Sequence, residues 1–63
     1  MTDTRVTRAA LFFWFVAEAP SETDMRTLFA AIATNDEAAI RALIVACNGP
    51  TTDERWEEAL ASV

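Results

Sequence analysis

The feature that most constrains this chain is an unbroken apolar run from Ala9 to Ala17, in which every residue from Leu11 to Phe15 is large. A helix turns about 100° per residue, so five consecutive large side chains point around its whole circumference. A surface helix of a soluble protein carries only one apolar stripe. Neighbours on several sides, or a second chain, must therefore cover this segment.

We expect the run to belong to a helix that lies innermost in the fold or at a seam between two copies. If the circumference of such a helix is divided into three sectors, one layer of packing covers one sector, and the other two remain uncovered as flanks. The predicted inward stripe is Val6, Ala10, Phe13 and Ala17, and the two flanks are Leu11 with Trp14 and Phe12 with Phe15.

Other interpretations of the run are weaker. A transmembrane helix needs roughly 20 apolar residues, so membrane spanning is not expected. A β-strand suits the aromatic composition but would need a partner strand, such as one from a second copy. A signal peptide fits the basic residues before the run and the small-x-small sequence at 17–19, but Asp3 lies in the basic region and Pro20 would follow the cleavage site. We therefore expect a cytoplasmic protein.

The size of the chain also points to self-association. Sixty-three residues form a single domain, 1–63, that buries only about 60% of its unfolded surface. Small domains are usually stabilised by disulfides, metal ions or oligomerisation. The chain has one cysteine and no histidine, so the first two are nearly excluded within one chain. We predict a homodimer.

Charge is distributed unevenly. The net charge is −5, yet residues 1–19 carry two acids and two arginines and sum to zero. Direct binding to nucleic acid is not expected, because that affinity comes from clustered lysine and arginine. A basic surface on a partner remains compatible with the acidic remainder of the chain.

Helix start and stop signals divide the chain into four segments, and the predicted fold is an all-α bundle of four short helices at about 4–18, 22–33, 36–47 and 53–62. Pro20 ends the first helix, and Asn48-Gly49-Pro50 ends the third. The predicted N-terminal caps are Ser21, Thr34 with Glu37, and Thr51 with Glu54. The predicted apolar stripes are Met25, Leu28, Phe29 and Ile32; Ile40, Leu43, Ile44 and Cys47; and Trp56, Ala59, Leu60 and Val63.

Residues 28–44, Leu-Phe-Ala-Ala-Ile-Ala-Thr-Asn-Asp-Glu-Ala-Ala-Ile-Arg-Ala-Leu-Ile, resemble the helix pair of a degenerate ankyrin repeat. The resemblance lacks the Thr-Pro-Leu-His start of that family and has Asn35 where the family has glycine. It implies a helix-pair geometry and hints at protein binding, and it assigns no functional residue.

No pattern of catalytic residues is present, and we predict a protein that is not an enzyme and needs no cofactor or metal. Six acids fall in the first turns of predicted helices, where they complement the helix dipole. Cys47 lies on an apolar stripe with no histidine to act as its base, so an inert, buried thiol is expected.

The aromatic excess is therefore the main functional signal. We predict a protein-interaction module that docks on a larger protein as a regulator or inhibitor, because tryptophan and other aromatic residues are enriched at interfaces. The alternatives are an acidic decoy that occupies a nucleic-acid-binding groove and a membrane-associated protein anchored by its first helix. The predicted residues for binding a partner or a second copy are Leu11, Phe12, Trp14, Phe15 and Trp56.

Overall fold

The computed structural model describes residues 3–63 and confirms the all-α prediction. That range contains no strand, so the apolar run is helical and the strand interpretation is wrong. The four helices are α1 (Thr4–Val16), α2 (Glu22–Ala33), α3 (Glu37–Ala46) and α4 (Asp53–Ser62).

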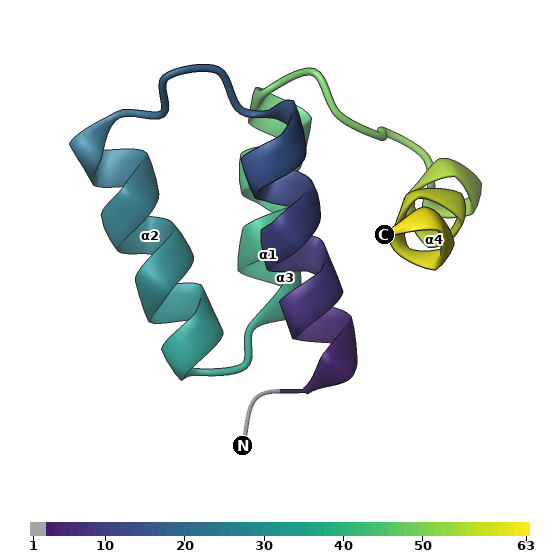
Figure 1. The fold of residues 1–63 in the computed structure, drawn as a ribbon, viewed down its shortest axis with the longest axis horizontal. Helices are drawn as coiled ribbons and strands as arrows, with labels where there is room; N and C mark the ends of the chain where they lie inside the picture. The colour runs from purple at the N-terminus through teal and green to yellow at the C-terminus, as the bar shows by residue number, and fades with distance from the viewer. Residues whose placement is uncertain (1–2) are drawn as a thin grey trace.

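Helix α1 occupies the central position, as expected, since it packs against each of the other three helices. Successive helices α1, α2 and α3 run in alternating directions, whereas α4 is seen nearly end-on and crosses them at a large angle (Figure 1). The Cα atoms form a flattened body with extents of 28 × 27 × 16 Å. Because α1 lies in front of α3 in this view, one side of α1 faces away from the core (Figure 1).

The core draws on all four helices. It consists of Val6, Ala9, Ala10, Phe13, Leu28, Ala31, Ile40, Ile44, Trp56 and Leu60. The observed inward stripe of α1 therefore includes Ala9, which was not predicted. The predicted Ala17 is only half-buried and packs at the edge of the core. The prediction for α2 needs a larger correction, because Phe29 is exposed and Ala31 is buried in its place.

Side-chain caps begin each helix, but two of them differ from the prediction. Asp3 caps α1, and Ser21 forms a capping box with Asp24 at the start of α2. Asp36, and not Thr34, caps α3 by accepting a hydrogen bond from the Ala39 N–H at 3.2 Å. At α4 the cap is Thr52, one residue after the predicted Thr51.

The shift at α3 has a local cause, because Thr34 already belongs to the end of α2. Asn35 adopts a left-handed conformation with φ of 59°, and the Asp36 N–H reaches the Ala31 carbonyl at 2.8 Å. Together with the bond from the Asn35 N–H to Ile32, this is a Schellman motif. Asp36 is thus the first residue free to cap the next helix.

The end of α1 also differs from the predicted Glu18. Ala17 is already extended, and Ala19 has a φ of 47° just before Pro20. Since proline disfavours helical geometry in the residue before it, the chain leaves the helix early and turns toward α2.

A second Schellman motif ends α3 and places Gly49 against the preceding helix. Asn48 takes the left-handed position with φ of 64°, and the Gly49 N–H bonds the Ile44 carbonyl at 2.8 Å. A Cβ atom on Gly49 would lie 2.2 Å from Ile44 Cγ2 and 2.8 Å from Ile44 O. Glycine is required at position 49 because any side chain would collide with Ile44, and not because the backbone there has a positive φ.

We expect Gly49→Ala to lower the free energy of unfolding by about 1–3 kcal/mol, because the added methyl group must displace buried Ile44. Urea unfolding followed by circular dichroism measures this change. Asn48→Gly is the control and should be nearly neutral, because glycine accepts the left-handed conformation. Equal stability of Gly49→Ala and the wild type would contradict this account of the α3 terminus.

Candidate interaction surface

Four of the five predicted binding residues lie together on the outer side of α1. Phe15 is 84% exposed, and Leu11 and Trp14 are each slightly more than half exposed. Phe12 is half-buried, and its ring stacks on that of Phe15 with 6.3 Å between ring centroids. We call Leu11, Phe12, Trp14 and Phe15 the aromatic face.

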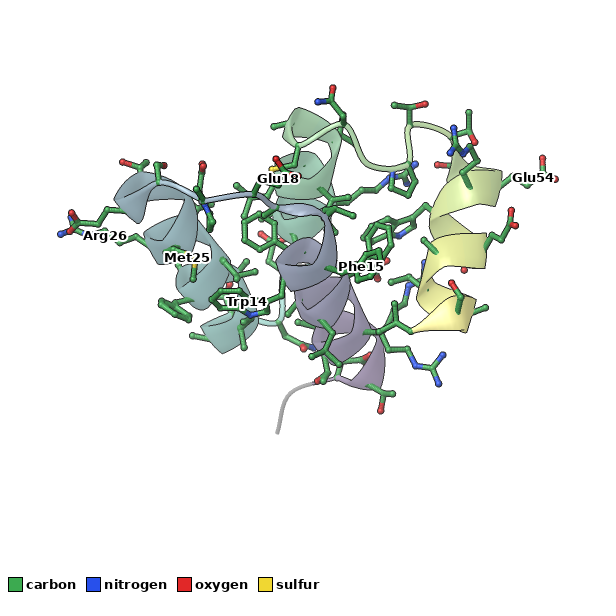
Figure 2. The ribbon with its side chains drawn as sticks, turned by 45° about the horizontal axis from the view of Figure 1, so that its top comes forward. Trp14, Phe15, Glu18, Met25, Arg26 and Glu54 are labelled. Carbon is green, nitrogen blue, oxygen red and sulfur yellow. The ribbon has the colours of Figure 1, made fainter. Side chains whose placement is uncertain are left out.

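The aromatic face spreads to both sides of α1. Trp14 extends toward α2, on the same side as Met25, whereas Phe15 extends toward α4 (Figure 2). Phe29, which is 58% exposed, lies one turn beyond Met25 on α2.

On the α4 side the aromatic face lines a shallow groove of about 420 Å³. Its walls are Leu11, Phe12 and Phe15 of α1 with Ser62 and Val63 at the end of the chain. Exposed Val63 adds a further apolar side chain. The groove offers apolar contact and no charged side chain, which is suited to an apolar anchor from another surface.

Trp56 does not belong to this surface, and its inclusion among the binding residues is corrected. It is 1% exposed and lies in the core. Its indole N–H donates to Glu37 Oε1 at 2.9 Å, and the Arg41 guanidinium lies 5.6 Å from the ring centroid. Arg41 also pairs with Asp53 at 2.5 Å. This set of contacts joins α4 to α3.

Arg5 forms a second connection, which the sequence patterns did not reveal. Its Nε lies 2.6 Å from both carboxylate oxygens of Glu37, and its terminal nitrogens pair with Glu57 of α4. The hydrogen bonds with Glu57 and Glu37 raise the pKa of Arg5, and the pairing with Arg5 lowers the pKa of Glu57. One arginine thus links α1, α3 and α4 through ion pairs that are partly exposed to solvent.

The acids do not form a continuous row on one face. The carboxylates of Asp3, Asp24 and Asp36 accept hydrogen bonds from backbone N–H groups at helix starts. Others pair with arginine, namely Glu22, Glu37, Asp53 and Glu57. Seven of the ten acids therefore cap a helix or pair with arginine, and pairs such as Arg5 with Glu37 and Arg5 with Glu57 join different helices.

The described residues were also compared with the requirements of a metal site and of a membrane-spanning helix. Residues 3–63 contain no group of three or more side chains placed to hold a metal ion. None of the four helices has both the length and the apolar character that crossing a membrane requires. Cys47 is a free, half-buried thiol at the end of α3.

Compared with protein-family models, curated proteins and solved structures, the chain has no match. Residues 28–44, which resemble an ankyrin helix pair, lie in α2, α3 and the turn between them, and these two helices run antiparallel (Figure 1).

Proposed function

We propose that this protein is a non-enzymatic interaction module that binds another protein through the aromatic face of α1 and thereby regulates it. The observation that carries the proposal is the exposure of Leu11, Trp14 and Phe15 on one helix whose opposite side forms the core. Such a contiguous apolar patch on a folded domain marks an interaction site more often than scattered apolar residues do.

The composition of the face supports a protein partner. Aromatic residues contribute large contact areas and dominate binding hot spots. Helix α1 is held by its buried side in the core, so the face is presented by a packed scaffold and little ordering free energy is required on binding. We propose the cytoplasm as its compartment.

The two alternatives have less support. An acidic decoy needs carboxylates at phosphate-like spacing, whereas the acids here are dispersed among helix caps and arginine pairs. A membrane-surface helix needs a polar face rich in lysine and arginine, and α1 carries only Arg5 and Arg8.

The proposal is tested by affinity capture from a lysate with wild type, Phe15→Ser and Val45→Ser. Phe15→Ser should reduce retention of bound proteins by about tenfold or more, because a central aromatic anchor contributes about 2 kcal/mol or more. Val45 is 41% exposed and belongs to α3 and not to the helix that carries the aromatic face, so Val45→Ser is the matched control and should retain them. Equal retention by all three proteins would remove the case for the aromatic face.

A further inference from the structure

We propose that Asn48 is a site of spontaneous deamidation whose rate is controlled by the folded end of α3. The reaction modifies the segment that links α3 to α4, which lies outside the aromatic face, so it is independent of the proposed function (Figure 1). Asparagine is a chemically labile residue. Its side-chain amide reacts most readily when glycine follows, because glycine has no side chain to hinder attack by its backbone nitrogen. Asn48-Gly49 is the only such pair in the chain.

The reaction needs water as its co-reactant. The backbone nitrogen of Gly49 loses its proton to solvent base and attacks the side-chain carbonyl carbon, Cγ, of Asn48. A bond forms between that nitrogen and Cγ, the bond from Cγ to the side-chain nitrogen breaks, and this nitrogen takes up a proton and leaves as ammonia. Water then opens the resulting succinimide at either of its carbonyl carbons. The product is aspartate, or isoaspartate, in which the main chain continues through the former side chain.

The structure distinguishes Asn48 from the other asparagine in an equivalent position. Asn35 and Asn48 both adopt the left-handed conformation in a Schellman motif, with φ of 59° and 64°. The Asn35 side-chain oxygen accepts the Asp3 N–H at 2.8 Å, and the next residue, Asp36, carries a side chain. Asn48 is exposed, its side chain has no hydrogen bond to another residue in the range 3–63, and glycine follows it. We therefore expect modification at Asn48 and not at Asn35.

The native backbone restrains the attacking nitrogen. The Gly49 N–H donates to the Ile44 carbonyl at 2.8 Å, so this hydrogen bond must break before the nitrogen can lose its proton. Pro50, the next residue, is buried and holds the segment against the fold. The reaction therefore requires that the end of α3 opens, and its rate follows the population of that open state.

Isoaspartate at position 48 does not fit the native end of α3. It adds one carbon atom to the main chain just before Gly49, which lengthens the chain by about 1.5 Å. There is no room for this shift, because even a Cβ atom on Gly49 would collide with Ile44. The modified chain must lose the hydrogen bond to Ile44 and displace the segment that positions α4. Aspartate keeps the normal main chain and should preserve the fold.

Peptide mapping by mass spectrometry tests the proposal after the chain is incubated at one pH and temperature, folded in buffer and unfolded in guanidinium chloride. Deamidation at Asn48 should be at least about tenfold slower in the folded chain, because the Gly49 nitrogen is restrained there. In the unfolded chain, Asn35 should react about tenfold more slowly than Asn48, because the residue that follows it has a side chain.

Gly49→Ala is the chemical control in the unfolded sample, where its effect on stability does not enter. The added methyl group hinders the attack and should slow modification of Asn48 by about tenfold. Asn48→Gly removes the site, and the peptide that contains position 48 should then keep its mass throughout the incubation.

Equal rates at Asn48 in the folded and unfolded chains would overturn control by the end of α3. Modification of Asn35 as fast as Asn48 in the unfolded chain would overturn the choice of site. The isoaspartyl and aspartyl forms are then separated by chromatography and compared by urea unfolding. The isoaspartyl form should unfold at a lower urea concentration, and equal unfolding of the two forms would overturn the expected effect on the α3–α4 link.

Discussion

Replacing Trp56 by alanine is expected to abolish most of the stability of this domain. The side chain is 1% exposed, and removing a buried tryptophan costs about 3–5 kcal/mol. A chain of this length has a total free energy of unfolding of roughly 3–9 kcal/mol. The substitution also leaves Glu37 without its indole donor and Arg41 without the ring beside it.

Trp14→Ala is the matched control for this experiment. Trp14 is 52% exposed on the aromatic face, so its removal should cost only about 1–2 kcal/mol of the free energy of unfolding, clearly less than removal of Trp56. Both variants are compared by urea unfolding at low protein concentration, so that self-association does not contribute to stability. A Trp56→Ala protein that unfolds at the wild-type urea concentration would contradict the assignment of Trp56 to the core.

The second large effect is expected inside the apolar run itself. Phe13 is fully buried and Phe15 is 84% exposed, although they are two residues apart on the same helix. Phe13→Ala should cost about 3–5 kcal/mol of stability, whereas Phe15→Ala should cost about 0.5 kcal/mol or less. Thermal unfolding followed by circular dichroism distinguishes these outcomes directly.

The comparison tests which side of α1 faces the core. If Phe15→Ala destabilised the monomer as strongly as Phe13→Ala, the helix would be enclosed on both sides. The aromatic face would then not exist as a surface, and the proposed function that depends on it would fail. A difference of several kcal/mol in the expected direction supports the orientation on which the proposed function rests.

Much of the fold was predictable from local sequence signals. The bounds of α2 and α4 agree with the predicted 22–33 and 53–62, because capping residues and an intervening proline act within a few residues of the helix end. The caps of α3 and α4 were less predictable. Thr34 and Thr51 have suitable side chains, but the neighbouring turns decide which of several nearby polar residues reaches the free N–H groups.

The candidate site was predicted in part for a similar reason. Helical periodicity placed Leu11, Trp14 and Phe15 outside a single buried stripe, and they are exposed. Trp56 has the same residue type as Trp14 but the opposite environment. Only the crossing of α4 over α1, with Glu37 and Arg41 beside the ring, decides that this tryptophan is enclosed.

Sequence alone therefore determined that the chain is helical, where its helices lie to within about two residues, and that α1 carries more apolar surface than one contact can cover. These properties depend on interactions within one or two helical turns. Tertiary structure decided that Phe29 is exposed, that Trp56 is buried and that Arg5 links α1, α3 and α4. Those outcomes depend on contacts between different helices, such as Trp56 with Glu37 and Arg5 with Glu57, whose distance is set only when the helices pack.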